Sequence, residues 1–368
     1  MTLALYRKYR PDKLADLLGQ ETTREILQNA AKQDKFAHAY LFYGPRGTGK
    51  TTTARLIAKL ANCEKRSSDK KFASQGEPCN TCGHCAEIES GKSLDVMEID
   101  AASNRGIDEI RNLQEGVRLS PISSPYKVYI IDEVHMLTRE AFNALLKTLE
   151  EPPAHAIFIL ATTEYEKVPP TITSRVQRFA FRRLPKNIII EKLESICEQE
   201  KIAYDKDALE IIAVAAEGSV RDAESLLDQL WSSIGKIEAK NVEEALGRVG
   251  LTRLYNFGIL LINYDLPKSL EYITELGDTG VNLVQFNKDL IHYLRRVLSL
   301  KLNPQLATLF EKELTADDIK KLKELGEKGN ETFLIAMLKS LIHAHSEMRY
   351  SPFAIVPLEV AVIENLKK

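Results

Sequence analysis

A glycine-rich phosphate loop constrains the fold of this chain more than any other feature. It fits the pattern G-x-x-x-x-G-K-[ST] and consists of Gly44, Pro45, Arg46, Gly47, Thr48, Gly49, Lys50 and Thr51. An apolar run precedes it and a helical pattern at 51–61 follows, which is the context that such a loop requires. The glycines let backbone N–H groups point at phosphate oxygens, and the helix start adds a positive end. Lys50 would neutralise phosphate charge and Thr51 would offer its hydroxyl to Mg²⁺. The loop therefore predicts a nucleoside triphosphate site.

Four apolar runs are predicted to be strands: residues 39–43, 94–99, 128–131 and 157–161. The last two are almost unbroken, as is typical of strands that are buried on both faces. Helical patterns lie between the runs. One of them, 139–151, has Phe142, Leu145, Leu146 and Leu149 on one face and stops at two prolines. Alternating strands and helices predict an α/β domain with a parallel sheet and helices on both faces.

The strand signal fades after residue 184. Helical patterns alone fill 185–235, and apolar residues recur three or four apart over 254–261, 283–300 and 332–348. A length of 368 residues also suggests two or three domains. We expect an α/β domain at 1–182, a small helical domain at 183–247 and a helical C-terminal domain at 248–368. The polar stretch 64–78 is predicted to be a mobile loop.

Two carboxylates follow the third predicted strand. Asp132 and Glu133 come directly after an apolar run, so they lie at the carboxyl edge of the predicted sheet, where α/β folds bind ligands. Asp132 would hold Mg²⁺ through water, and Glu133 would polarise the water that attacks the phosphate. Alone, such a pattern is a common strand end. The phosphate loop upstream makes a nucleotide-hydrolysing site the better interpretation.

Four of the five cysteines lie between the phosphate-loop helix and the next predicted strand. They are Cys63, Cys79, Cys82 and Cys85. Two residues between neighbouring cysteines let both sulfurs reach one ion, and four thiolates form a closed tetrahedral shell with bonds of about 2.3 Å. The pattern predicts a structural zinc site in a module at 63–85. Free thiols and an iron–sulfur cluster are the alternatives. His84 could replace a cysteine, but we favour the four thiolates, and Cys197 is expected in a helical core.

The overall charge and the apolar runs exclude several classes of function. Lys and Arg number 50 against 52 Asp and Glu, a net charge of −2, so any contact with nucleic acid must come from a local patch. No apolar run is long enough to span a bilayer, and the first residues lack the core of a signal peptide. We therefore expect a cytoplasmic protein with no membrane partner, whose thiols stay reduced.

Several further segments carry a family resemblance together with the phosphate loop: Tyr6 to Pro11, Gly19 to Glu21, Ile131 to Leu137, Asn143 to Pro153 and Leu160 to Thr163. They resemble the gamma/tau subunits of bacterial DNA polymerase III, which are clamp-loader ATPases of the AAA+ type. The resemblance covers nearly the whole chain and is densest in the first two expected domains. It implies an AAA+ α/β domain with a zinc insertion, then a helical lid domain and a helical collar domain for oligomerisation.

The resemblance also implies what the protein does. The chain would be an ATPase that uses ATP, Mg²⁺ and Zn²⁺ and loads a sliding clamp onto primed DNA within the DNA polymerase III holoenzyme. Its partners would be other clamp-loader subunits, the clamp and the DNA, and it would carry no polymerase active site of its own. Arg105 and Arg111 match a loop and helix start that track the DNA backbone in the family. A solvated charged face explains these two arginines equally well.

Two roles near the nucleotide follow from the resemblance. Arg10 and Pro11 belong to the segment that lies against the adenine ring in the family, and a basic N-terminal tail is the alternative. Thr163 matches the polar sensor that contacts the γ-phosphate or the attacking water. Without the resemblance it would be an ordinary threonine at the end of a strand.

The resemblance also assigns two arginines. Arg175 matches the arginine finger that reaches ATP on a neighbouring subunit, where a planar, always-charged guanidinium stabilises the transferred phosphoryl group. Val176 replaces the usual cysteine of that motif, and a surface salt bridge is the alternative role for Arg175. Arg221 matches the second sensor, carried by the lid to the γ-phosphate. Ser219 and Asp222 beside it also resemble an N-cap and its capping-box acid.

The predicted site residues form four sets. The catalytic set is Lys50, Asp132, Glu133, Thr163, Arg175 and Arg221. The nucleotide-binding set is Arg10, Pro11, Gly44, Pro45, Arg46, Gly47, Thr48, Gly49, Lys50, Thr51, Thr52 and Arg221. The metal ligands are the four cysteines for zinc, and Thr51 and Asp132 for magnesium. The DNA set is Arg105 and Arg111.

Three other interpretations compete with a clamp-loader ATPase. Residues 132–135 fit the D-E-x-H box of a helicase, but the helical remainder offers no second motor domain. A scaffold subunit with a decayed nucleotide site conflicts with intact Lys50, Thr51, Asp132 and Glu133. Another AAA+ machine, such as a helicase loader or branch-migration motor, does not explain the cysteine module or Arg175.

Overall fold

The computed structural model describes residues 3–245, 251–310, 314 and 316–367. The chain forms two compact units, the first made of residues 1–196 and 215–228 and the second of residues 197–214 and 229–368. The expected boundary at 247/248 lies outside the described residues. The division into three domains stays a prediction.

The first unit is built on a five-stranded parallel sheet with the order β2-β3-β4-β1-β5. The strands are β1 (Ala39–Tyr43), β2 (Val96–Asp100), β3 (Lys127–Asp132), β4 (Ala156–Thr162) and β5 (Gln177–Ala180). β3 and β4 are buried almost throughout, because helices cover both faces. The four predicted strands and the parallel sheet are confirmed. β5 was not predicted, because it is an edge strand with only Phe179 buried.

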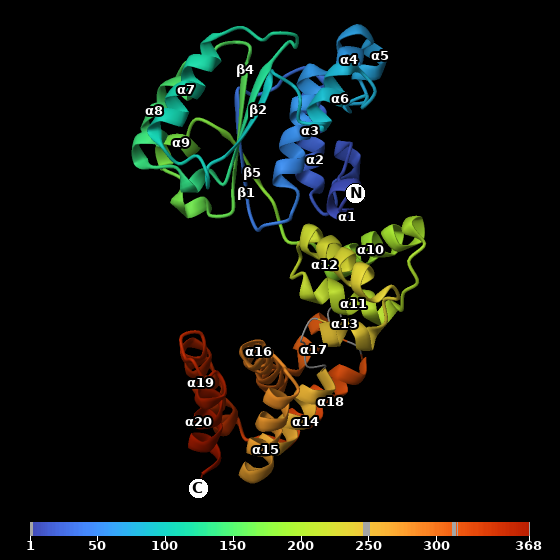
Figure 1. Ribbon diagram of the computed structural model, residues 1–368, viewed down its shortest axis with the longest axis vertical. Helices are drawn as coiled ribbons and strands as arrows, with labels where there is room; N and C mark the ends of the chain where they lie inside the picture. Colours follow the sequence, from blue (N-terminus) through green and yellow to red (C-terminus); the bar gives the residue numbers. More distant parts are fainter. Residues whose placement is uncertain (1–2, 246–250, 311–313, 315, 368) are drawn as a thin grey trace. The chain divides into compact units, whose positions relative to one another are not determined.

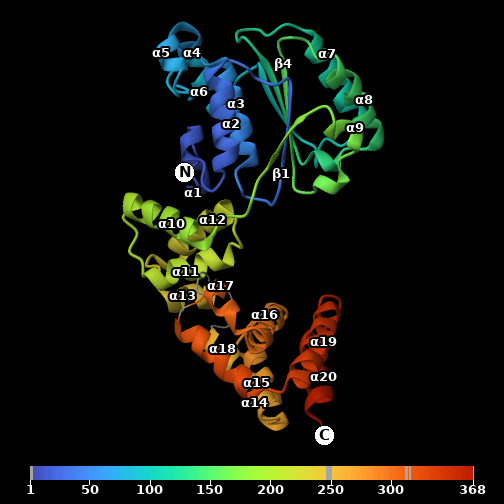
Figure 2. The same cartoon turned by 180° about the vertical axis from the view of Figure 1, so that it is seen from behind.

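Helices pack on both sides of this sheet (Figures 1 and 2). One side carries α2 (Glu21–Lys32) and α3 (Lys50–Asn62), and their apolar residues share a core with Tyr40, Phe42 and Ile159. The other side carries α7 (Ile107–Arg118) and α8 (Arg139–Glu150), which pack on Leu41, Tyr129 and other residues of the same strands. The predicted face of α8 is confirmed, with Phe142, Leu145 and Leu149 buried and Leu146 partly buried.

The prediction of a mobile loop at 64–78 is wrong. This segment contains α4 (Glu64–Ser68) and α5 (Lys70–Ala73), and α6 (Gly83–Glu89) follows it. Arg66 is buried and donates hydrogen bonds to backbone carbonyls of α2 and α3. Glu77 accepts hydrogen bonds from the backbone N–H groups of Leu14 and Ala15, at 2.7 and 2.9 Å. The polar composition suggested a solvent-exposed loop, but these charged side chains are buried and bind backbone groups instead of water.

Outside the sheet, the described parts of the chain are mainly helical, as predicted for 185–235, 254–261, 283–300 and 332–348. Short helices in the first unit are α1 (Leu5–Lys8) and α9 (Pro170–Thr173), and three 3₁₀ turns lie at Leu14–Asp16, Val134–Met136 and Tyr165–Lys167. The helices that follow the sheet are α10 (Lys186–Glu200), α11 (Lys206–Ala215), α12 (Val220–Ile234) and α13 (Ala239–Ala245). The last group is α14 (Leu251–Ile262), α15 (Leu266–Asp278), α16 (Leu283–Leu302), a 3₁₀ turn at Pro304–Leu306, α17 (Ala307–Phe310), α18 (Ala316–Lys328), α19 (Glu331–Met348) and α20 (Ile355–Leu366).

Residues of α14 to α20 share one apolar core in the second unit, which includes Phe257, Phe286 and Leu341. α19 lies against both α20 and α16. Cys197 is buried, as expected. Among the described residues, no helix is both long enough and apolar enough to cross a membrane.

Candidate nucleotide site and metal module

One cavity of the first unit collects most of the predicted nucleotide site. Its walls come from the phosphate loop, the carboxyl end of β3, the N-terminal segment and the start of α12. The predicted residues that line it are Arg10, Pro11, Arg46, Gly47, Thr48, Gly49, Lys50, Thr51, Thr52, Asp132, Glu133 and Arg221. Gly44, Pro45, Thr163 and Arg175 do not line it. Lining residues outside the predicted set are Tyr6, Leu17, Leu18, Leu184, Lys192, Val220 and Glu224.

The phosphate loop needs glycine at two positions for steric reasons. Gly44 and Gly47 have φ of 141° and 71°, in the region that other residues rarely adopt. A Cβ atom on Gly44 would lie 2.1 Å from the carbonyl oxygen of Phe181, and one on Gly47 would lie 1.8 Å from Ser219 Oγ. The loop therefore approaches the residue that follows β5 and the start of α12 so closely that any side chain would displace it.

Lys50 is buried at the start of α3. Its Nζ donates to the carbonyl oxygens of Gly44 and Pro45 at 2.7 and 2.8 Å. Burial lowers the pKa of Lys50, and the charges of Glu133 and Asp132 oppose that shift. The Lys50 ammonium group thus binds carbonyl oxygens of the phosphate loop, and oxygens of a bound triphosphate could replace them as its partners.

Thr51 and Asp132 meet at the carboxyl edge of the sheet. The Thr51 hydroxyl donates to Asp132 Oδ2 at 2.7 Å. A hydroxyl and a carboxylate in contact beside a phosphate loop supply the oxygen ligands that Mg²⁺ prefers, with room left for water and phosphate oxygens. The two residues fit the predicted magnesium site.

Glu133 points toward the end of β4. Its Oε2 accepts hydrogen bonds from Thr163 N and Thr163 Oγ1, at 3.1 and 2.9 Å. His135 lies on the other side, with Nδ1 3.3 Å from Glu133 Oε2 and 2.9 Å from Thr162 Oγ1, and Nε2 3.2 Å from Glu164. Thr163 therefore joins the site through Glu133 and not through the cavity wall. No sequence motif indicated a role for His135, because two of its three partners, Thr162 and Glu164, come from the end of β4.

Arg221 extends from α12 toward the N-terminal segment. Its guanidinium lies 4.9 Å from the centre of the Tyr6 ring. The Ser219 hydroxyl accepts a hydrogen bond from Asp222 N at 3.2 Å, so Ser219 is an N-cap. Ser219 N–H binds the carbonyl of Ala216, so the second half of a capping box is not made. The cap sets the direction of the first turn, which carries Arg221.

Arg175, Arg105 and Arg111, which were predicted to act on a neighbouring subunit or on DNA, lie on the surface outside the cavity. Arg175 Nε donates to Glu150 Oε1 at 2.9 Å, and its Nη1 donates to the Thr171 carbonyl at 2.7 Å. Arg105 donates to the Ala102 carbonyl, and Arg111 pairs with Asp108 at 3.3 Å. The structure does not bring any of the three to its own phosphate loop.

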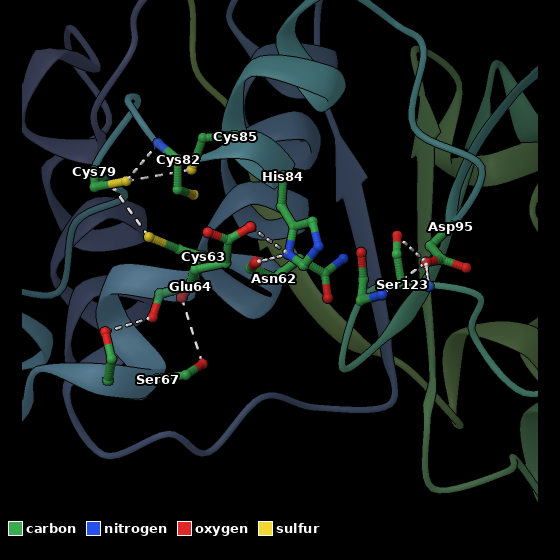
Figure 3. A network of polar contacts seen from close by, with 12 residues as sticks. Asn62, Cys63, Glu64, Ser67, Cys79, Cys82, His84, Cys85, Asp95 and Ser123 are labelled. Atoms are coloured by element: carbon green, nitrogen blue, oxygen red, sulfur yellow. Dashed lines mark hydrogen bonds and ion pairs between the residues drawn. The ribbon is translucent and has the colours of Figure 1, made fainter.

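The four predicted zinc ligands converge beside α3 (Figure 3). All four sulfur atoms lie within 4.8 Å of one another, and the sulfurs of Cys79 and Cys85 are 3.9 Å apart. A tetrahedral shell with 2.3 Å bonds places its sulfurs about 3.8 Å apart, so a single ion fits. Backbone N–H groups point at the sulfurs, for example Cys79 N to Cys63 at 3.4 Å and Cys82 N to Cys79 at 3.3 Å. Such donors favour thiolates, which supports a zinc site.

His84 stands beside this cluster but outside it. Its Nδ1 lies 2.9 Å from the carbonyl oxygen of Asn62 and 3.7 Å from Glu64 (Figure 3). A side-chain hydrogen bond from Cys85 is the main cause that lowers the pKa of Cys63. The cluster therefore favours a charged sulfur even before a metal is considered.

Fold and site together define a class. The parallel sheet carries a phosphate loop after β1, an acidic pair after β3 and a polar residue after β4, and a following helix adds an arginine. This combination is typical of an AAA+ P-loop ATPase.

Sequence comparisons narrow this class to one family. Family profiles match in succession: "DNA polymerase III, delta subunit" over residues 19–185, "DNA polymerase III clamp loader subunit, ATPase lid domain" over 188–232 and "DNA polymerase III subunits gamma and tau domain III" over 237–367. DNA polymerase III subunit gamma of Buchnera aphidicola subsp. Schizaphis graminum is 36% identical over 98% of this chain and 97% of that protein. The chain belongs to the DNA polymerase III gamma/tau family, and the resemblance seen in the sequence is confirmed.

Other relatives differ in length. DNA polymerase III subunit tau of Bacillus subtilis is 45% identical over 98% of this chain, which spans 62% of that protein. Among solved structures, the Thermotoga maritima RuvB Holliday junction branch migration motor shares 18% identity, with a TM-score of 0.47 over 69% of this chain and 79% of that chain.

Proposed function

We propose that this chain is an ATPase subunit of the replicative clamp loader, using ATP binding and hydrolysis to load the sliding clamp onto primed DNA within the DNA polymerase III holoenzyme. One observation carries the proposal. A single cavity brings together Lys50 and Thr51 of the phosphate loop, the acidic pair Asp132 and Glu133, and Arg221 of α12. Membership of the gamma/tau family supports it. Polymerisation is left to other subunits.

The residues divide the work of hydrolysis. Lys50 exchanges its two carbonyl partners for oxygens of the triphosphate, and Arg221 leaves the Tyr6 ring for the γ-phosphate. Glu133 orients a water molecule and takes its proton as the water oxygen bonds to the γ-phosphorus. The bond from that phosphorus to the bridging oxygen breaks, which yields ADP and phosphate. Thr163 holds Glu133 in position through two hydrogen bonds.

Thr51 and Asp132 would hold Mg²⁺, which neutralises charge on the phosphates when bound. Cys63, Cys79, Cys82 and Cys85 would hold Zn²⁺ in a closed shell with a structural role.

Arg175 acts in trans in this proposal. It lies outside its own cavity and pairs with Glu150, both partly exposed, and such surface pairs contribute about 1 kcal/mol or less. The pair can therefore open when a neighbouring subunit presents its γ-phosphate. The helical C-terminal region serves as the collar that holds the subunits together, and Arg105 and Arg111, both exposed, contact DNA phosphates.

An ATPase assay with clamp and primed DNA tests the proposal. Phosphate release by the reconstituted loader should rise when both are added, and Lys50→Ala should abolish nucleotide binding and turnover. Lys147→Ala, an exposed lysine on α8, serves as the matched control and should change neither. Turnover that ignores clamp and DNA, or that survives Lys50→Ala, would refute the function.

A further inference from the structure

Glu224 is a buried acid in the wall of the nucleotide cavity. It lies on α12, one helical turn after Arg221, and only 5% of its surface is exposed. Among the residues that the structure describes, its carboxyl group makes no hydrogen bond and no ion pair. Buried polar groups without partners are costly, so such a group beside a ligand cavity points to a partner supplied by the ligand.

The charge of a triphosphate decides which part of the ligand Glu224 faces. Phosphates occupy the loop at residues 44–51, and a carboxyl group close to them would meet repulsion. The nucleoside offers donors instead: the ribose hydroxyls and the amino group of the base. Val220, one turn before Glu224 on the same side of α12, lines the cavity together with Leu17, Leu18 and Leu184. Apolar walls suit a flat purine base better than a ribose.

The electrostatics of the site agree with this role. Burial raises the pKa of Glu224 to about 7, and the charges of Lys192 and Arg10 oppose that shift. Both cations act on Glu224 through space, and the hydrogen bond of Lys192 Nζ goes to the Tyr9 carbonyl at 3.1 Å. Either protonation state of the carboxyl group keeps an oxygen that accepts a hydrogen bond.

We propose that Glu224 is a specificity-determining residue that accepts a hydrogen bond from the 6-amino group of adenine when ATP binds. A purine without that amino group leaves the buried carboxyl unsatisfied, and inosine triphosphate places a carbonyl oxygen there. This inference rests on the proposed function of the cavity as an ATP site.

Nucleotide-binding affinities of the full chain test the inference. The probes are ATP, 2′-deoxy-ATP, inosine triphosphate and purine riboside triphosphate, which has no group at position 6. The unsubstituted chain should prefer ATP over purine riboside triphosphate by about tenfold or more, the worth of one hydrogen bond in a buried site. Glu224→Leu should bring that ratio close to one while the affinity for purine riboside triphosphate is kept. Glu224→Gln, which retains an acceptor oxygen, should preserve the preference.

Each other outcome has a distinct meaning. An ATP preference that survives Glu224→Leu overturns the inference. If Glu224→Leu weakens the binding of all four nucleotides equally, Glu224 has a purely structural role and the inference is overturned too. If only the ratio of ATP to 2′-deoxy-ATP affinity changes, Glu224 binds the ribose and the assignment to adenine is overturned. Failure of the unsubstituted chain to bind any nucleotide would instead refute the ATP site itself. Thermal unfolding of each variant checks that it is folded.

Discussion

At the scale of single residues, Glu133 links the cavity to the neighbouring strand. It has φ of 48°, an uncommon conformation for glutamate, and its carboxylate is held by both donors of Thr163. Local strain of this kind persists only where surrounding contacts fix it, and it clusters at functional sites. The position of the carboxylate is thus set by the end of β4 as well as by its own loop.

Glu133→Gln should block hydrolysis without affecting nucleotide binding. The amide oxygen can still accept from Thr163, but the amide cannot take a proton from water. We expect single-turnover phosphate release to fall by about 10²-fold or more, with the dissociation constant for ATP changed by less than about threefold. Rapid-quench kinetics and equilibrium titration measure the two quantities. Near-normal hydrolysis by this variant would remove Glu133 from the role of base.

Glu224 should make the nucleotide-free chain less stable as pH rises. Its pKa is about 7 in the folded chain against the ordinary glutamate value of 4.5, so the folded state binds more protons between these pH values. Stability therefore falls as pH rises through that window, by up to about 3 kcal/mol. Glu224→Gln cannot ionise and should be more stable than the parent at pH 8 but similar at pH 4. Urea unfolding at both pH values measures this, and a pH-independent difference would contradict it.

Residues in local motifs could be predicted from the sequence, and residues placed by tertiary contacts could not. Lys50 and Asp132 belong to patterns with fixed spacing. His135 and Glu224 gain their surroundings from β4 and the N-terminal segment, far away in sequence. The sequence pattern alone shows neither burial nor partners at such positions.

At the scale of elements, the cysteine module shows the same limit. The spacing of Cys79, Cys82 and Cys85 predicted a metal site, and the four sulfurs do converge. Neither helix has an apolar face of its own, so both were missed: α4 is held by hydrogen bonds from Arg66 to carbonyls of α2 and α3, and α5 packs on α4. The edge strand β5 was missed for the related reason that one buried side chain leaves almost no pattern.

Removal of zinc should loosen this module and leave the sheet folded. We expect about one zinc ion per chain by elemental analysis, and four additional reactive thiols after chelation, because the shell takes all four sulfurs. Cys82→Ser should lose the metal. His84→Ala should keep it, since His84 binds the Asn62 carbonyl instead. A metal content that depends on His84 would contradict the four-thiolate shell.

Glu77 should stabilise the attachment of the cysteine module to the N-terminal segment through its hydrogen bonds. Its carboxylate accepts from Leu14 N, Ala15 N and Gln28 Nε2 and is almost fully buried. Glu77→Ala leaves these donors without a partner and should lower the free energy of unfolding by about 2 kcal/mol or more. Glu87→Ala, at an exposed position of α6, is the control and should change it by less than about 0.5 kcal/mol. Equal effects in urea denaturation would show that Glu77 does not stabilise this attachment.

At the scale of the whole molecule, the proposed active site is completed by two chains. The cavity is lined by the phosphate loop, by Glu133 as the proposed base and by Arg221 as the proposed sensor, while Arg175 lies on the surface outside it. An isolated chain would lack this cation at its γ-phosphate and would hydrolyse ATP slowly. Rapid hydrolysis would therefore require a correctly assembled neighbour. The helical C-terminal region would supply the contacts that bring neighbours into register.

Single-turnover ATP hydrolysis by the assembled loader tests this claim most directly, with Arg175→Ala compared against Arg178→Ala. Arg178 is exposed and donates to the Tyr165 hydroxyl at 3.0 Å, so it controls for loss of surface charge. Arg175→Ala should keep ATP affinity within about twofold and slow hydrolysis by about 10³-fold, as for other arginine fingers, while Arg178→Ala should leave both unchanged. An isolated chain that hydrolyses ATP at the rate of the assembly, or an Arg175→Ala assembly as fast as the parent, would contradict the account.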